Sequence, residues 1–169
     1  MRLLHQIGDR KNGSNFNTLE EIMACQEDWS FDGIYESVWN HRHELAAVRG
    51  KRRIILFVMG QYVGGDNSFD APQPFSRYLT WEQLFELSYC LKAEIGWHSH
   101  SHPNLTTLTD ERVRAELRHP FPMKAFAYPG GAVDARIAAL VKEAGFEEAW
   151  SVTQGDGTNF QKNRPYLNW

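Results

Sequence analysis

The stretch Arg53-Ile54-Ile55-Leu56-Phe57-Val58-Met59 is the clearest structural signal in the chain. A continuous apolar run of this length is typical of a strand in a sheet that is covered on both faces. Short apolar runs and amphipathic stretches of helical length alternate on either side of it. This alternation predicts an α/β fold with a mostly parallel sheet.

The expected elements can be placed along the chain from apolar spacing and helix-capping signals. Strands are predicted at 3–7, 29–32, 53–59, 93–97, 123–128 and, as the last one, 148–152; helices are predicted at 18–26, 35–48, 80–91, 109–117 and 134–144. Thr18 and Thr80 each precede a Glu or Gln by three residues, which is the spacing of a capping box, and Asp134 is an expected N-cap. Residues 60–78 form a long loop, and such loops in compact domains usually serve a function or cover a site.

Length and composition bound the class of protein. One domain over residues 1–169 is expected, because this length can bury a single sizeable core. The formal net charge of −3, with both signs interspersed, gives no field to attract nucleic acid or an anionic membrane. The absence of any membrane-length apolar run or signal-peptide pattern predicts a soluble cytoplasmic protein. Cys25 and Cys90 are expected to be reduced thiols.

Three histidines fall within five residues directly after a predicted strand, in the stretch Trp97-His98-Ser99-His100-Ser101-His102-Pro103. Imidazole is the commonest protein ligand for zinc and similar divalent metals. His98 and His102 are the expected ligands, held on a loop that folds back after the strand, whereas His100 is expected to point the other way. The alternative is that one or two of these histidines only cap or fill the strand end.

Polar or glycine-rich groups also follow the other predicted strands. Asp32 ends one strand, Pro129-Gly130-Gly131 ends another, and residues 153–156 follow the last. In parallel α/β sheets and barrels the functional site forms at the carboxyl ends of the strands, so these groups are expected to converge. Two histidines and one carboxylate would supply the three protein ligands of a catalytic zinc, whose bound water is acidified toward neutral pH.

The remaining candidates each have a functional and a plain structural interpretation. Asp32 is a candidate general base or a loop cap. Asp66, in the long loop, is the other candidate carboxylate, although an Asp-Asn-Ser turn explains it without function. A backbone N–H at Gly130 could approach a developing oxyanion, and a plain Pro-Gly turn is an equally good interpretation.

Three stretches, in order along the chain, resemble the motifs of the polysaccharide deacetylase family of carbohydrate esterases. Ser30-Phe31-Asp32-Gly33 resembles its first motif, Thr/Ser-Phe-Asp-Asp, as a Phe-Asp-Gly variant. Residues 94–105 resemble the second motif, Glu-Ile-Gly-x-His-x-x-x-His-Pro-x-Leu. Phe126-Ala127-Tyr128-Pro129-Gly130-Gly131, with the helix that follows, resembles the third, Arg-x-Pro-Tyr-Gly. The similarity covers about residues 30–153.

This resemblance implies a distorted or incomplete (β/α) barrel that hydrolyses an N-acetyl or O-acetyl group on a saccharide with the help of a divalent metal. By resemblance, His98 and His102 are metal ligands and Asp32 aligns with the catalytic base of the family. Gly33 stands where the family has its metal-binding aspartate. Either Asp32 or Asp66 would then have to be the third ligand.

Three further features depart from the family pattern. Ala127 replaces the arginine that orients the base, and Gly130 replaces the tyrosine, although a backbone N–H would still be available there. No histidine follows His119, so the late catalytic acid of the family has no counterpart.

Two functional hypotheses follow. The first is an active deacetylase of a saccharide, as in surface-polysaccharide biosynthesis, with zinc as the expected metal and cobalt or nickel as alternatives. Its substrate is expected to contact Asp66, Trp97 and Tyr128. The second is a degenerate relative that binds carbohydrate or metal without turnover. An incomplete barrel would leave an open sheet edge, which favours a homodimer.

Overall fold

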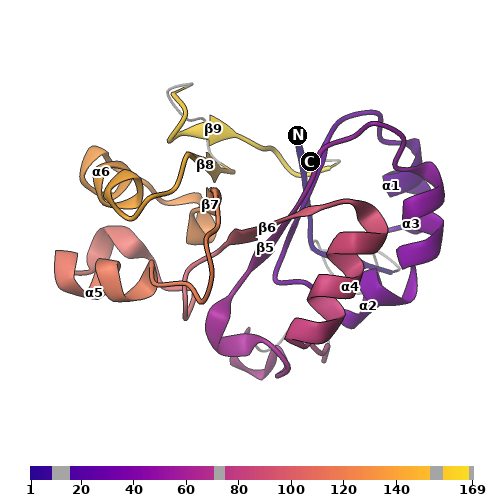
Figure 1. Cartoon of the computed structure of the whole chain (residues 1–169), viewed down its shortest axis with the longest axis horizontal. Helices are drawn as coiled ribbons and strands as arrows, with labels where there is room; N and C mark the ends of the chain where they lie inside the picture. The colour runs from indigo at the N-terminus through magenta and orange to yellow at the C-terminus, as the bar shows by residue number, and fades with distance from the viewer. Residues whose placement is uncertain (9–15, 71–74, 153–157, 168–169) are drawn as a thin grey trace.

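A curled parallel sheet organises the computed structural model, which describes residues 1–8, 16–70, 75–152 and 158–167 (Figure 1). Within these residues the main sheet has seven strands in the order β1-β4-β5-β6-β7-β8-β9. They are β1 (Arg2–Leu4), β4 (Trp29–Asp32), β5 (Ile54–Val58), β6 (Glu94–Trp97), β7 (Ala125–Ala127), β8 (Glu148–Ser151) and β9 (Lys162–Asn163). A small second sheet pairs β2 (Gln6–Ile7) with β3 (Phe16–Asn17).

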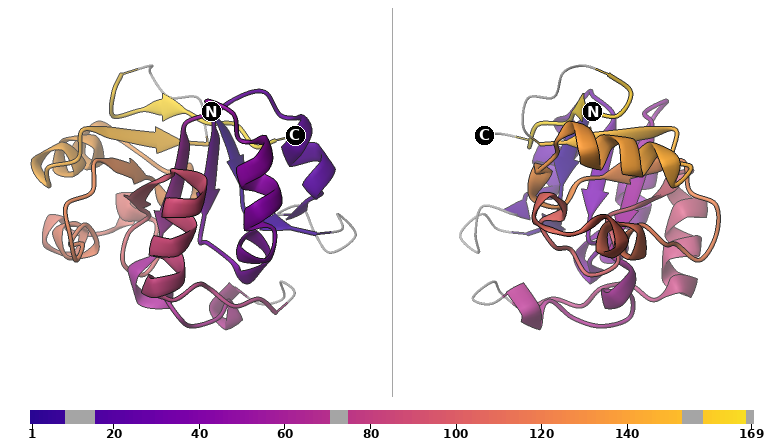
Figure 2. Two further views of the ribbon diagram at one scale, coloured as in Figure 1. Left: turned by 45° about the vertical axis from the view of Figure 1, so that its right-hand side comes forward. Right: turned by 90° about the vertical axis from the view of Figure 1, so that its left-hand side faces the viewer.

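Helices cover the outer face of this sheet (Figure 2). They are α1 (Leu19–Ala24), α2 (Glu36–Asn40), α3 (Arg42–Val48), α4 (Trp81–Leu91), α5 (Asp110–Glu116) and α6 (Ala135–Glu143). Short 3₁₀ turns lie in the connections: η2 (Gly60–Tyr62), η3 (Ser68–Asp70), η4 (Leu105–Thr107) and η5 (Pro129–Gly131). Both predicted capping boxes form, at Thr18 and Thr80, and Asp134 accepts from the backbone N–H of Ile137.

The two faces of the sheet have different neighbours because strand side chains alternate between them. Leu56 and Val58 of β5 belong to the core cluster that includes helical side chains such as Leu84 and Leu87. Ile55 and Phe57, from the same strand, belong to a separate cluster with Ala125 and Ala127. The inner face is where the polar groups of the site, described below, also lie.

The C-terminal segment pairs with β1, at one edge of the sheet. The backbone N–H of Leu3 donates to the carbonyl of Pro165 at 3.0 Å, and that of Leu167 donates to the carbonyl of Leu3 at 3.2 Å. The expected distorted or incomplete (β/α) barrel is therefore confirmed as a curled parallel half-barrel. The edge that was expected to be open is paired at β1, which removes the reason given for a homodimer; assembly itself stays a prediction.

Three expectations about the helices and strands are wrong, including that the strand at 148–152 is the last one. The helix predicted at 35–48 is broken into α2 and α3 at His41, whose φ of −103° and ψ of 16° leave the helical region. The strand predicted at 3–7 is divided between two sheets. The strand at 148–152 is followed by β9, a short polar strand without the apolar periodicity that identifies a strand from sequence.

Two smaller expectations concern the cysteines and membrane insertion. Cys25 and Cys90 are free thiols, as predicted. In the part of the chain that the structure describes, no helix has both the length and the apolar character needed to cross a bilayer.

Candidate active site

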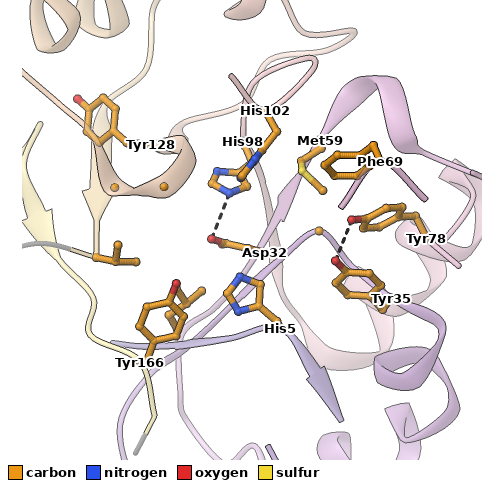
Figure 3. A pocket seen from close by; sticks show the side chains of 15 residues that line it. His5, Asp32, Tyr35, Met59, Phe69, Tyr78, His98, His102, Tyr128 and Tyr166 are labelled. Carbon is orange, nitrogen blue, oxygen red and sulfur yellow. Dashed lines mark hydrogen bonds and ion pairs between the residues drawn. The ribbon is translucent and has the colours of Figure 1, made fainter. Parts of the chain in front are cut away.

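A pocket of about 170 Å³ opens where the strands of the main sheet end (Figure 3). Asp32 from the end of β4, His98 and His102 from the loop after β6, and Gly130 from the turn after β7 all line it. These residues are separated by up to almost 100 positions in the sequence. The predicted convergence of strand ends is therefore confirmed for them.

Arg164 forms a bidentate ion pair with the carboxylate of Asp32. Its two terminal nitrogens donate to the two carboxylate oxygens at 2.6 and 2.7 Å, and the side chains of both residues are buried. Arg164 follows β9 directly, and its backbone N–H donates to the carbonyl of Ser151 at 2.9 Å. Its guanidinium also lies over the ring of Phe57, at 4.8 Å from the centroid. A bidentate pair of this kind fixes the orientation of the carboxylate as well as its charge.

Asp32 is consequently a permanent anion at the base of the pocket. Burial acts to raise its pKa, but the charge and hydrogen bonds of Arg164 outweigh burial and hold that pKa well below its usual range. A general base works best when its pKa lies near the pH of the reaction. Asp32 is thus better suited to attract a cation than to remove a proton.

His98 turns an unprotonated nitrogen toward that anion. Its Nδ1 lies 2.8 Å from the carbonyl oxygen of Ala127. A carbonyl can only accept, so Nδ1 carries the hydrogen. Burial lowers the pKa of His98 to about 3, so the ring is neutral near pH 7 and its Nε2 has a lone pair. This Nε2 lies 3.2 Å from Oδ2 of Asp32, so two hydrogen-bond acceptors face one another.

His102 stands beside this pair on a loop with unusual backbone angles. Ser99 and His102 have φ of +66° and +61°, the left-handed region that non-glycine residues seldom adopt. The hydroxyl of Ser99 accepts from the backbone N–H of His102 at 2.9 Å, and Glu116 accepts from the backbone and hydroxyl of Ser101. The rings of His98 and His102 are 4.8 Å apart between centroids.

The donor set of this cluster suits a divalent metal. As they stand, no three His, Cys, Asp or Glu side chains among the described residues are placed to hold an ion together. Asp32 and His98, however, present a carboxylate oxygen and an imidazole nitrogen to each other at 3.2 Å, and the ring of His102 lies beside that of His98. The Nδ1 bond of His98 to a backbone carbonyl is the usual second hydrogen bond of a metal-binding histidine.

Gly33 shows that the neighbouring position has no room for a side chain. Its φ is +56°, and a Cβ there would lie 2.7 Å from the terminal carbon of Met59 and 2.9 Å from a ring carbon of Tyr78. The space beside Asp32 is thus occupied by atoms of Met59, which directly follows β5, and of Tyr78, in the long loop. The carboxylate of this site comes from Asp32.

Gly130 and Tyr128 both line the pocket, in different ways. Gly130 has a φ of +60°, and nothing lies within 4 Å of where its Cβ would be, so the backbone is open to a bound molecule. The hydroxyl of Tyr128 donates to the carbonyl of Phe160 at 2.7 Å. Figure 3 shows that this hydroxyl points away from Asp32, leaving the ring to line the pocket.

Two expected substrate contacts are not brought to the pocket. Asp66 accepts from the backbone N–H of Ser68 at 3.0 Å, as in the turn that was its structural interpretation. Trp97 is buried in a core cluster, and its Nε1 donates to the carbonyl of Glu116. His100 is exposed and is not among the lining residues, as expected. Residues 153–156 lie outside the described part of the chain.

Three site residues were not anticipated. Arg164 supplies the arginine that Ala127 does not, and His5 and Tyr166 line the pocket with their rings 5.7 Å apart between centroids. Figure 3 shows His5 on the opposite side of Asp32 from His98. His5 directly follows β1, but the strand predicted at 3–7 contained it, so its place after a strand could not be recognised from the sequence. Arg164 could not be placed either, because β9 cannot be recognised from its sequence.

Comparisons of sequence agree with these motifs. A family model described as Polysaccharide deacetylase matches residues 31–149. Chitin deacetylase 1 of Cryptococcus neoformans var. grubii is 33% identical over 100 residues, which cover 52% of this chain. The alignment covers only 21% of that relative, so this chain matches about a fifth of its length.

Solved structures share the same architecture. A polysaccharide deacetylase from Bacillus cereus superposes with a TM-score of 0.76 at 14% identity, over 98% of this chain and 63% of that one. The Streptococcus pyogenes deacetylase PplD, solved in complex with acetate, gives a TM-score of 0.74 at 12% identity, over 98% and 90% of the two chains. At these identities the likeness shows the fold alone.

Proposed function

Because this chain belongs to the polysaccharide deacetylase family, we propose that it is a metal-dependent hydrolase that removes N-acetyl or O-acetyl groups from a saccharide. The observation that supports this most directly is the pair of acceptors at the base of the pocket, Oδ2 of Asp32 and Nε2 of His98, 3.2 Å apart. We place the reaction in the cytoplasm, on a saccharide of the kind used in surface-polysaccharide biosynthesis.

Asp32, His98 and His102 are the residues that would hold the metal, with zinc as the expected ion and cobalt or nickel as alternatives. Two imidazoles and one carboxylate form a ligand set found in catalytic zinc sites, with a position left for water. When bound, such an ion polarises a carbonyl and acidifies water. Asp32 takes the role of ligand in this proposal, because its low pKa makes it a weak base.

The other residues of the site orient the acyl group and move protons. Water adds to the acyl carbon, the bond from that carbon to nitrogen or oxygen breaks, and the sugar amine or alcohol leaves with a proton while acetate is released. The backbone N–H of Gly130 is positioned to donate to the oxygen that becomes negative. We assign the proton donated to the leaving group to His5, which lines the pocket across Asp32 from His98.

Metal content and acetate release, measured on the same preparations, test the proposal. About one ion per chain is expected in wild type by elemental mass spectrometry. His98→Ala and Asp32→Asn should lose the ion and acetate release while retaining the circular dichroism spectrum. His5→Gln should retain the ion and slow acetate release by about 10²–10⁴-fold, the usual contribution of a general acid or base.

Asp66→Asn is the matched control, because this carboxylate lies outside the pocket. It should change neither the metal content nor the rate of acetate release. Wild type that takes up no zinc, cobalt or nickel would contradict the metal site. Wild type that binds metal and acetylated saccharides without releasing acetate would support the degenerate-relative hypothesis.

A further inference from the structure

Four aromatic rings form a continuous row from solvent to the base of the pocket. Phe69 stacks on Tyr62 with ring centroids 3.9 Å apart and an angle of 13° between the planes. Tyr62 lies 6.1 Å from Tyr78, and Tyr78 lies 4.5 Å from Tyr35. The buried end of the row adjoins the site, since Tyr78 contacts the Cβ position of Gly33, the residue after Asp32.

The outer end of the row is exposed at the pocket rim. Phe69 lines the pocket and is 44% exposed, whereas Tyr78, two steps further in, is 6% exposed. A single exposed aromatic ring is ordinary on a protein surface. Phe69 differs from that case because a second ring supports it from behind and because it borders the candidate active site (Figure 3).

The loop that carries Phe69 is held by hydrogen bonds at its stem. The backbone N–H of Tyr78 donates to the carbonyl of Gly65 at 3.0 Å, and that of Asn67 donates to the carbonyl of Ser76 at 3.0 Å. The side-chain oxygen of Asn67, a buried residue, accepts from the N–H of Ser76 at 2.8 Å. These bonds fix the two sides of the loop against each other, so the stack of Tyr62 and Phe69 is built into the fold.

The pocket itself is too small to enclose a saccharide longer than its reacting unit. Its volume of about 170 Å³ lies below the roughly 300–1,000 Å³ of pockets that enclose drug-sized ligands. Any further sugar unit must therefore lie outside the pocket, over its rim. The exposed face of Phe69 is the aromatic surface available there, and an aromatic ring suits the C–H face of a sugar ring.

We propose that Phe69, supported by Tyr62, is a binding platform for a second sugar unit, next to the unit whose acetyl group enters the pocket. This inference rests on the proposed deacetylase function. Phe69 contributes binding and chain-length specificity at the rim of the pocket.

The test compares N-acetylglucosamine with its β-1,4-linked tetramer as probes, using the metal-loaded protein. Acetate release gives kcat/KM for each probe, and calorimetric titration gives the affinity for the tetramer. Phe69→Ala should reduce kcat/KM and affinity for the tetramer by about tenfold, through a higher KM, because a buried apolar contact is lost. Its kcat/KM for the monosaccharide should fall by less than its kcat/KM for the tetramer. Phe69→Trp should retain the preference for the tetramer.

Phe85→Ala is the matched control, because Phe85 on α4 is 50% exposed and is not a pocket residue. It should behave like wild type. A Phe69→Ala variant that retains the preference for the tetramer, or a wild type without such a preference, would overturn the platform. Tetramer binding that depends on Phe69 without any acetate release would support the platform and contradict the proposed function. If the wild type neither binds the tetramer nor releases acetate, both the platform and the proposed function are overturned.

Discussion

Charged side chains are arranged differently at the two ends of the half-barrel. At the amino ends of the strands, Arg53 pairs with both Glu94 and Glu148, and Lys162 pairs with Glu148 at 2.6 Å. Two cations thus meet two anions, and the network joins β6, β8 and β9 to the segment before β5. At the carboxyl ends, Arg164 neutralises the buried Asp32, and the neutral His98 then presents a lone pair to that same carboxylate.

The comparison separates charge used to join strands from charge arranged to receive a ligand. The network at the amino ends has equal numbers of positive and negative charges and lies near the surface, with the Arg53 side chain 36% exposed. The cluster at the carboxyl ends is buried, with Nε2 of His98 3.2 Å from Oδ2 of Asp32. In barrels of parallel strands, the amino end commonly serves stability and the carboxyl end function.

Arg164→Met should have the largest effect on stability. It would leave the buried Asp32 without its cationic partner, and breaking a buried pair in this way costs about 3–5 kcal/mol. Urea denaturation, with a chelator present to exclude metal, measures the free energy of unfolding. The double variant Arg164→Met/Asp32→Asn should recover much of the loss, because the uncompensated charge is then gone. A loss below 1 kcal/mol in the single variant would contradict the contrast between the two ends.

Glu148→Gln should have a smaller, pH-dependent effect. Burial acts to raise the pKa of Glu148, but hydrogen bonds from Arg53 and Lys162 outweigh it and lower that pKa. The stabilisation from a carboxylate with a lowered pKa is complete above its usual pKa of 4.5 and is lost as the pH falls below that value.

Denaturation at pH 7 should therefore show a loss of about 2 kcal/mol in Glu148→Gln, the cost of losing hydrogen bonds to charged groups. The difference from wild type should shrink as the pH is lowered from 5 to 3. Metal content should not change. A difference that is constant over this pH range would show that the network does not depend on the charge of Glu148.

Gly130→Ala and Gly145→Ala form the smallest and most closely matched comparison. Both glycines have positive φ, +60° and +95°, and neither has an atom within 4 Å of its Cβ position. Each substitution should cost about 1 kcal/mol, the strain of a left-handed residue with a side chain. Only Gly130 lines the active-site pocket, so only Gly130→Ala should slow acetate release. Equal activity in the two variants would show that the substrate does not closely approach the backbone at Gly130.

Sequence patterns predicted the parallel sheet and the core of the site because these depend on local signals. The apolar run at 53–59 contains β5, and both threonine capping boxes form. The clustered histidines and Asp32 each follow a strand with a clear apolar pattern. Since all parallel strands end at the same edge, their convergence follows from topology alone.

The parts that sequence did not predict depend on long-range packing. β9 is a two-residue polar strand, so nothing in its own sequence identifies it or the position of Arg164 after it. Asp66 was a reasonable candidate carboxylate, but the loop that carries it turns it away from the pocket. Gly33 is explained by Met59 and Tyr78, whose positions only the folded structure shows.

The pairing of Leu3 with Pro165 and Leu167 also sets an order of assembly. These contacts span almost the whole chain, and contacts of such high sequence separation form late and slow folding. Arg164 reaches Asp32 only through this segment. During synthesis, the carboxylate at the base of the pocket therefore stays without this cation until residue 164 has left the ribosome.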